Sequence, residues 1–465
     1  MELLYNRKNA WEKYGGDHMQ NMNKFCDEYI DFLNKAKTER RFVNEVEKIA
    51  KENGFISYEH VIKNKLQPSQ GMKIYKTIKN KAIILCTVGR EDLTAGLNIV
   101  GAHIDAPRLD LKQNPLYEDT ELGMLETHYY GGIKKYQWTT IPLSLHGVVV
   151  KKDGESVDIC IGEDDEDPVF TITDLLPHLA KDQMQKTMTE GVCGEALNIL
   201  CGSIPCLEEA EKNTKVKTKI MQILNKKYGF TEEDFISAEI EVVPSFKAKS
   251  VGFDESMVGS YGQDDRACSY AAFRSILDVY LPERTCICIL TDKEEIGSVG
   301  NTGAYANIFE TFVEFLFKQT FCKVDIFDVK QCLENSRMLS ADVNPAVDPN
   351  YTGVQDPKNA SYLGKGVVVQ KYTGSRGKVG GSDANAEYLG YIRKIFDEHD
   401  IVWQSAELGK VDQGGGGTIA YMLAKYGIEV VDCGVAILSM HSPFEVTSKI
   451  DLYEMYRASK VFYEN

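Results

Sequence analysis

Positive charge is scarce in this 465-residue chain, which has 53 lysines and arginines against 69 aspartates and glutamates and a formal net charge of −16. Proteins that bind nucleic acid usually carry a basic surface that matches the phosphates, so we expect no nucleic-acid partner. The acidic balance also disfavours an anionic membrane surface. The first residues, MELLYNRKNAWEKYGGDHMQ, lack the pattern of a secretory signal, and the longest apolar run, near VVDCGVAILSM, is too short to cross a bilayer. We therefore expect a cytoplasmic protein without a membrane partner.

Closely spaced cysteine pairs are also rare. The twelve cysteines are scattered, and several of them, including Cys86, Cys286 and Cys433, lie inside apolar runs. Cys201 and Cys206 are close, but without a second pair or nearby histidines they make a poor zinc site. The cysteines are therefore expected to be buried, reduced thiols rather than disulfides.

The chain is long enough for two domains, or for one large domain with an insertion. Residues 29–54 have the spacing of two amphipathic helices, the second ending at Asn53 and Gly54, and KAIILCTVG and LNIVGAHID are typical of buried strands. From about 110 to 245 the sequence becomes rich in strand patterns, with a turn at Asp153 and Gly154.

After residue 250, strands alternate with helices again, and 428–441 is expected to be the last strand, followed by a final helix. This alternation predicts an α/β fold: a mixed, largely parallel, doubly wound sheet formed by residues 1–110 and 245–465. A β-rich domain, residues 111–244, is inserted into it. The sequence has no internal repeat, and no low-complexity linker separates the inserted domain from the α/β domain.

Histidines and carboxylates follow the strands of the predicted sheet. The predicted strand LNIVGAHID ends with His103 and Asp105, and the glutamate doublet at 294 and 295 follows the strand RTCICIL. The segment GQDDRA is expected to start a helix. In an open α/β sheet, ligands gather at the carboxyl ends of the strands. The candidate site residues are His103, Asp105, Asp264, Glu294, Glu295, Asp342 and His441.

Each candidate has an ordinary explanation when taken alone. A histidine at a strand end is usually a hydrogen-bonded surface residue, Asp264 could cap a helix, the glutamates could form a solvated turn, and Asp342 could start a turn. Together, two imidazoles and at least three carboxylates on one edge suit zinc, cobalt or manganese.

The charge of three carboxylate ligands favours two divalent ions over one, and such a pair is typical of amide or phosphate hydrolysis. One carboxylate must then stay off the metals as a general base, so the doublet at 294 and 295 can supply one ligand and one base. Asp105, two residues after His103, is a better orienting partner for that imidazole than a ligand.

Five motifs follow one another along nearly the whole chain: GAHIDAPRLDLK, GQDDRA, TDKEEIGSVGNTGA, SADVNPAVDPNY and MHSPFEV. In sequence and in order they resemble the aminopeptidase I / aspartyl aminopeptidase family of dinuclear zinc metallopeptidases. The resemblance implies an α/β catalytic domain with an inserted dimerisation domain. It also implies hydrolysis of amino-terminal residues from short peptides, within a homo-oligomer that is typically a dodecamer built from dimers.

The resemblance also assigns roles. His103 and Asp342 would hold one metal, Glu295 and His441 the other, and Asp264 would bridge them. The general base would then be Glu294, and Asp105 would orient His103. Each subunit would hold two divalent ions, zinc in the first place, with cobalt and manganese as alternatives.

Further residues are weaker candidates. His178, in LLPHLA, resembles a histidine of the inserted domain that reaches a neighbouring subunit's active site, although an ordinary helix histidine is equally consistent. His128 is a lesser candidate for the same part. Lys371 and Arg376 lie in a segment that lines the substrate side in the family and could favour an acidic substrate residue, or could be surface charges. The segments GQDDR and VDQGGGGTIA depart from the eukaryotic pattern.

Two alternatives stay open from the sequence. A related dinuclear scaffold could act as a deacylase or carboxypeptidase, which free and blocked amino termini in the substrate would distinguish. The chain could also be a non-catalytic structural homologue, although such a chain would be expected to have lost a ligand or the base.

Overall fold

The computed structural model describes residues 4–207, 214–320 and 325–465. The chain forms two compact units. The first takes in the chain up to Asp105, then Ala248–Met440 and Phe444–Asn465; the second takes in Ala106–Lys247 and His441–Pro443. The sequence-based boundaries, 110/111 and 244/245, differ from these by a few residues, and the sequence does not anticipate the short second-unit segment at His441.

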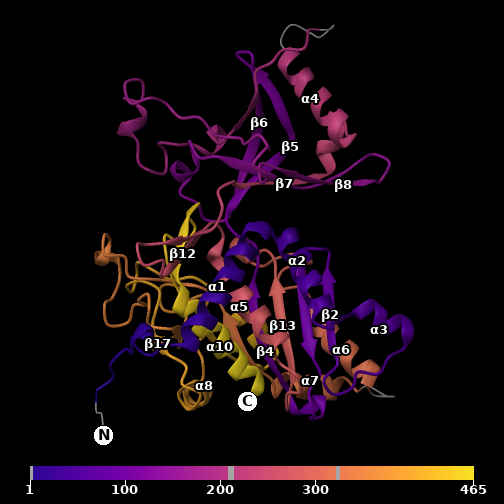
Figure 1. Cartoon of the computed structure of the whole chain (residues 1–465), viewed down its shortest axis with the longest axis vertical. Helices are drawn as coiled ribbons and strands as arrows, with labels where there is room; N and C mark the ends of the chain where they lie inside the picture. Colours follow the sequence, from indigo (N-terminus) through magenta and orange to yellow (C-terminus); the bar gives the residue numbers. More distant parts are fainter. Residues whose placement is uncertain (1–3, 208–213, 321–324) are drawn as a thin grey trace. The chain divides into compact units, whose positions relative to one another are not determined.

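A nine-stranded mixed sheet forms the centre of the first unit (Figure 1). Its middle strands β13, β4, β14 and β18 are mutually parallel, whereas β3 and β16 on either side of them run antiparallel. In order across the sheet the strands are β1 (Ile56–Ser57), β2 (Lys73–Ile78), β3 (Ala82–Thr87), β13 (Thr285–Thr291), β4 (Leu97–His103), β14 (Arg337–Ala341), β18 (Glu429–Gly434), β16 (Val367–Gln370) and β17 (Trp403–Ser405).

Helices cover both faces of this sheet, which confirms the predicted doubly wound α/β fold. On β13, Cys286 and Cys288 belong to one apolar core, and Ile287 and Ile289 belong to the other, as period-two alternation requires. The first core includes α1 (Asp17–Lys35), α2 (Glu39–Glu52), α5 (Gln263–Leu277), α8 (Ala386–Glu398) and α10 (Lys449–Glu464). The second includes α3 (Tyr58–Asn64), α6 (Ile308–Thr320), α7 (Ile326–Glu334) and α9 (Ala420–Ala424).

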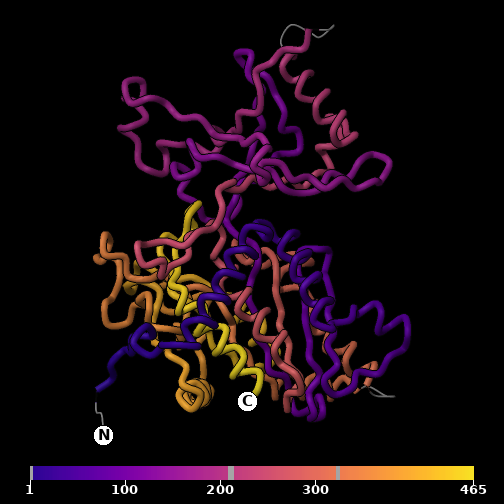
Figure 2. Tube along the Cα trace, in the orientation of Figure 1, coloured from indigo at the N-terminus to yellow at the C-terminus, as the bar shows by residue number. Residues whose placement is uncertain are grey.

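Two amino-terminal helices form and the second ends at Asn53, as the sequence predicts, but the first begins at Asp17, before the predicted stretch 29–54. The Thr38 hydroxyl accepts the Arg41 N–H at the start of α2, and Asn53 caps its end. Figure 2 shows α1 beside α10 at the other end of the sequence, and Phe25 and Tyr453 pack with ring centroids 5.7 Å apart. The first and last helices thus close the same face of the sheet.

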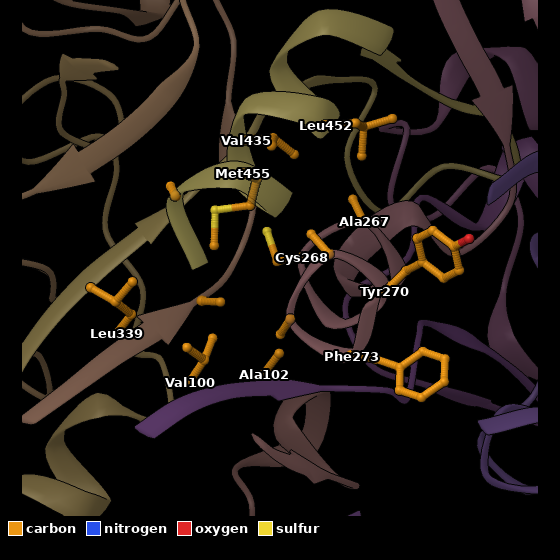
Figure 3. Close-up of a cluster of buried hydrophobic side chains, with 14 of the residues drawn as sticks. Val100, Ala102, Ala267, Cys268, Tyr270, Phe273, Leu339, Val435, Leu452 and Met455 are labelled. Atoms are coloured by element: carbon orange, nitrogen blue, oxygen red, sulfur yellow. The ribbon is translucent and has the colours of Figure 1, made fainter. Parts of the chain in front are cut away.

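The core between α5, α10 and the sheet is formed by small, aliphatic and aromatic side chains (Figure 3). Phe273 and Tyr270 of α5 are buried above Val100 and Ala102 of β4, with Met455 of α10 in the same cluster. Because α5 begins at the candidate site, this packing fixes where the helix start lies relative to the end of β4.

Truncating Phe273 is expected to destabilise the first unit strongly. Phe273 is fully buried, and Phe273→Ala leaves a cavity that typically costs about 3–5 kcal/mol. The midpoint of urea unfolding measures the effect, and Phe253→Ala, at a fully exposed phenylalanine of the same unit, is the matched control. Equal midpoints for the two variants would contradict the packing.

The predicted last strand, residues 428–441, is wrong as a single strand. The chain leaves the main sheet after β18 and enters a five-stranded sheet as β19 (Ala436–Leu438). Gly434 allows this, because a Cβ there would lie 1.8 Å from the Asp342 carbonyl oxygen. The smaller sheet has the order β11 (Lys249–Val251), β12 (Met257–Ser260), β20 (Glu445–Ser448), β19 and β15 (Asn344–Pro345), so β20 is the true last strand.

The second unit is built on a separate antiparallel sheet of six strands. The turn predicted at Asp153 and Gly154 joins two of them, β7 and β8, with Gly154 at a φ of 88°. The order is β8 (Ser156–Ile161), β7 (Leu143–Val150), β10 (Ala238–Pro244), β5 (Arg108–Asp119), β6 (Leu122–Tyr130) and β9 (Ile199–Gly202), with α4 (Lys215–Tyr228) as its helix.

The described residues also bear on two expectations drawn from composition. The eleven cysteines among them are all free, and most are buried, as predicted. No helix in these parts of the chain is long and apolar enough to cross a membrane.

Candidate metal centre

Three neighbouring strands bring the candidate residues together. The sheet order β13, β4, β14 places the strand that ends in His103 between the two strands that precede Glu294 and Asp342. His103 pairs in register with Thr291, the last residue of β13. Because the three strands are parallel, their carboxyl ends lie at one edge of the sheet.

His103 is the centre of this cluster and is almost completely buried. Its Nε2 atom lies 3.1 Å from Asp264 Oδ1 and 3.7 Å from Asp342 Oδ1. Burial lowers the pKa of His103, but hydrogen bonds to Asp105, Asp264 and Asp342 outweigh it and raise the pKa well above its usual range. The imidazole therefore lies among carboxylates that favour a positive charge at its position.

The two aspartates at the start of α5 contact different partners. Asp264 and Asp265 have non-helical backbone angles within the first turn, and the peptide bond between them is cis. Asp265 Oδ1 accepts the Cys268 N–H at 3.1 Å, as a helix cap does, whereas Asp264 faces His103. The N-cap of α5 is Gly262, so the sequence-based alternative for Asp264, a helix N-cap, is wrong.

Asp105 holds both the imidazole and the glutamate doublet. Its Oδ1 and Oδ2 atoms accept the backbone N–H groups of Glu294 and Glu295 at 3.1 and 3.2 Å. The same Oδ1 lies 3.3 Å from His103 Nδ1. Asp105 thus holds the ring of His103 through its carboxylate and through its carbonyl oxygen, which lies 3.1 Å from Nδ1. The same carboxylate anchors both backbone N–H groups of the 3₁₀ turn η7 (Glu294–Ile296), from which the two glutamate side chains extend.

Burial makes these acids difficult to ionise together. Desolvation, with the nearby charges of Asp342 and Asp264 adding to it, raises the pKa of Glu294 to about 8. Burial also raises the pKa values of Asp342 and Asp265. Crowded carboxylates with raised pKa values are the state that a bound cation would relieve.

The donor atoms fit a metal of the zinc type. Ligand atoms of His103, Glu294 and Glu295 lie within 4.8 Å of one another, and so do those of His103, Asp265 and Asp342. Imidazole nitrogen and carboxylate oxygen are zinc ligands, and they also suit cobalt and manganese.

His441 does not end a strand of the main sheet, contrary to the sequence-based expectation. It follows β19, which belongs to the five-stranded sheet, and it lies in the segment His441–Pro443 of the second unit. Within that unit, its Nδ1 atom lies 2.9 Å from the Gly132 carbonyl oxygen. An Nδ1 held in this way directs Nε2 away from Gly132.

The weaker candidates lie elsewhere in the fold. Lys371 follows β16, which runs antiparallel to β18, and its Nζ atom lies 3.7 Å from Asp383 Oδ1 in a hollow of about 460 Å³ that Tyr372 and Trp403 also line. Arg376 is exposed in the next loop. His178 is exposed in a turn of the second unit rather than in a helix, and His128 is exposed on β6.

The sequence reasoning missed two features of the site. Asp265 lies in the same cluster of potential ligand atoms as His103 and Asp342, and its only signal was its position beside Asp264. The anchoring of the doublet by Asp105 had no sequence signal, because it joins two segments that are far apart in the chain.

Known proteins resemble the chain over its full length. Residues 32–463 match the family described as aminopeptidase I zinc metalloprotease (M18). A probable M18 family aminopeptidase 1 of Clostridium acetobutylicum is 51% identical over 465 residues, covering 100% of this chain and 99% of the relative. The chain belongs to the M18 family of aminopeptidase I zinc metalloproteases. The predicted family, the predicted aminopeptidase activity and the expectation of a metal cofactor are thereby confirmed.

Solved structures of M18 aminopeptidases agree with the fold. The crystal structure of the Thermotoga maritima aminopeptidase has a TM-score of 0.95 at 48% identity, covering 99% of this chain and 100% of that chain. Aminopeptidase I from Clostridium acetobutylicum has a TM-score of 0.92 at 47% identity, with 100% of both chains covered. Membership of the M18 family supports the aminopeptidase hypothesis over the alternatives of a deacylase, a carboxypeptidase or a non-catalytic homologue.

Replacing Asp105 by asparagine is expected to lower activity and metal affinity by about 10- to 100-fold. An amide keeps the size of the side chain but has one acceptor oxygen for two backbone N–H groups and His103. Zinc titration of the metal-free variant and kcat/KM for an amino-terminal amide measure both effects. Wild-type values for both would show that Asp105 does not position this M18 centre.

Proposed function

We propose that this aminopeptidase holds two divalent ions, zinc in the first place, through five side chains. His103 and Asp342 would hold one ion, Glu295 and His441 the other, and Asp264 would bridge them. The observation that carries the proposal is the buried imidazole of His103 among carboxylates that come from neighbouring strands and the start of α5. His441 enters through its motif, MHSPFEV, and through its Nδ1 contact with Gly132.

The common anchor of the two glutamates supports the proposed division of work between them. Asp105 fixes the backbone of both residues, so their side chains can extend in different directions from one turn. Glu295 would serve as a ligand, and Glu294 would take a proton from the attacking water and pass it to the leaving amine. The burial that raises the pKa of Glu294 also suits a group that must bind and release a proton. When bound, the ions would activate that water and polarise the peptide carbonyl.

Asp264 rather than Asp265 is the proposed bridging ligand. Asp264 Oδ1 lies within hydrogen-bond distance of His103 Nε2, whereas Asp265 Oδ1 accepts the Cys268 N–H within α5. Asp264→Asn should therefore lower the metal content, and Asp265→Asn should act mainly on stability.

The test is metal analysis of the purified protein combined with a panel of peptides with free and acetylated amino termini. We expect about two ions per chain and hydrolysis of the free amino termini only. One ion per chain would contradict the dinuclear centre, and cleavage of acetylated peptides would contradict the substrate class.

The second unit is proposed to mediate dimerisation within a homo-oligomer. Leu175, Leu176 and Leu179, which flank His178, are all at least half exposed, and such a cluster suits burial against another copy. The aminopeptidase mApe1 of yeast, with 21% identity and a TM-score of 0.76, has been solved as a dodecamer. We propose a dodecamer here too, in which His178 or, less favoured, His128 reaches a neighbouring active site; light scattering tests its size.

Two further proposals concern location and side-chain preference. The acidic composition supports a cytoplasmic location and peptide substrates. It disfavours nucleic acid or a membrane surface as a partner. Lys371 is kept as a candidate for an acidic substrate residue, although Asp383 already offsets its charge. A Lys371→Met variant compared on aspartyl and leucyl amides tests this role.

A further inference from the structure

A buried carboxylate holds the backbone of the proposed bridging ligand. The Asp264 N–H donates a hydrogen bond to Glu445 Oε2 at 3.1 Å, and both residues are almost completely buried. The bond joins the first turn of α5 to β20, two segments that are 181 residues apart in the chain. Among the described residues, Glu445 belongs to none of the groups whose donor atoms could share a metal ion. It therefore contacts a proposed ligand without being one itself.

The Asp264 N–H needs a partner outside its own helix. It lies in the first turn of α5, where backbone N–H groups have no carbonyl partner within the helix. Asp264 also departs from the helical path, with φ −83° and ψ 106°. Its carboxylate lies 3.1 Å from His103 Nε2, while its N–H is bound to Glu445. The direction in which Asp264 presents its carboxylate thus depends on how its backbone is held.

Gln263, the residue before Asp264, holds the backbone of Glu445 in return. Its side-chain amide donates to the Glu445 carbonyl oxygen at 2.7 Å and to the Val258 carbonyl oxygen at 3.0 Å. Val258 and Glu445 lie on β12 and β20, which pair antiparallel with Ser260 opposite Glu445. The first turn of α5 and these two strands are therefore joined by hydrogen bonds in both directions.

Glu445 lies on a firmly held element. The strand β20 is paired with β12 on one side and with β19 on the other. A group on a paired strand is placed more precisely than a group on a loop. Glu445 also follows His441, another proposed ligand, by four residues in the segment MHSPFEV. One short segment of the chain thus carries both a proposed ligand and the carboxylate that holds a second one.

We propose that Glu445 is a positioning residue of the metal centre, which holds the Asp264 backbone so that the Asp264 carboxylate reaches its bridging position. The inference rests on the proposed role of Asp264 as a ligand. Ligand atoms must lie within about 0.2 Å of their ideal distances from the metal, so a small shift of the backbone weakens binding. Groups that hold a ligand in this way typically contribute about 10- to 100-fold to metal affinity.

The test measures the chelator concentration that removes half of the zinc from the full-length holoenzyme. The length of the side chain at 445, rather than its charge, should decide the result. Glu445→Asp keeps the charge but withdraws the carboxylate by one methylene group, so this concentration should fall about 10-fold or more. Glu445→Gln keeps an acceptor oxygen at the original distance from the backbone, so the concentration should stay within about threefold of the wild-type value.

Glu118→Asp is the matched control. Glu118 of the second unit also lies on a strand and accepts two N–H groups in the first turn of a helix, those of Val216 and Lys217 of α4, at 2.7 and 3.0 Å. The control should lower the unfolding temperature without changing the chelator concentration. A purely structural role of Glu445 would have the same signature in Glu445→Asp.

Two results would overturn the proposal. One is a wild-type chelator concentration in Glu445→Asp, and the other is a fall in Glu445→Gln as large as in Glu445→Asp or larger. The second result can be obtained from Glu445→Gln alone, which keeps the size of the side chain, if the shorter variant does not fold. Asp264→Asn in the same assay separates this inference from the proposed function. Wild-type zinc retention in Asp264→Asn would remove Asp264 as a ligand, whereas zinc loss there with retention in Glu445→Asp would refute only the role of Glu445.

Discussion

Glu294→Gln is expected to lower kcat by between about 10² and 10⁴ while the protein keeps its metal. Glutamine has nearly the same shape as glutamate and leaves the backbone N–H bond to Asp105 intact, so the turn should persist. An amide, however, cannot take a proton from water at neutral pH. Initial rates on an amino-terminal amide, together with elemental analysis of the same preparation, measure both parts of the prediction.

Glu295→Gln is the matched variant for this experiment, because its side chain leaves the same turn and its N–H is held by the same carboxylate. It should lose metal as well as activity, since a neutral amide is a weaker ligand than a carboxylate. If Glu294→Gln lost the metal and Glu295→Gln kept it, the two roles would be exchanged. Full activity in Glu294→Gln would show that Glu294 is not the general base.

Removal of metal by a chelator is expected to abolish hydrolysis and also to weaken the fold around His103. Without cations, the buried carboxylates face one another, and burial has already raised the pKa values of Asp342 and Asp265. Ligands that bind the folded state stabilise it, so zinc should raise the unfolding temperature as well as restore the rate. Cobalt and manganese should restore activity to different extents.

The control for chelation is the Glu294→Gln variant, which should gain the same thermal stability from zinc without gaining activity. Hydrolysis that persists after complete removal of metal would contradict the metal-dependent mechanism. Restored activity without any change in unfolding temperature would place the ions away from the buried cluster.

Much of the site was visible in the sequence because it follows local rules. Buried strands of four to seven residues end where polar residues begin, so His103, Glu294 and Asp342 could be placed at strand ends. Their convergence was an inference from the α/β fold. The sheet order β13, β4, β14 supplies the missing step, since it makes these three strands neighbours.

The rest depends on contacts between distant segments. The change of sheet after Gly434 was missed because β18 and β19 form one apolar run in the sequence. The close approach of the Asp342 carbonyl, which leaves no room for a side chain at position 434, has no local sequence pattern. The contact between Asp105 and the backbone of Glu294 spans 189 residues of sequence and has no local pattern.

Anomalous diffraction at the zinc edge, recorded from crystals of the active enzyme, tests the central claim most directly. The account predicts two peaks per chain among His103, Asp264, Asp342, Glu295 and His441, with the Glu294 carboxylate outside the coordination sphere of both. A single peak, or a peak coordinated by Glu294 in place of Glu295, would contradict it.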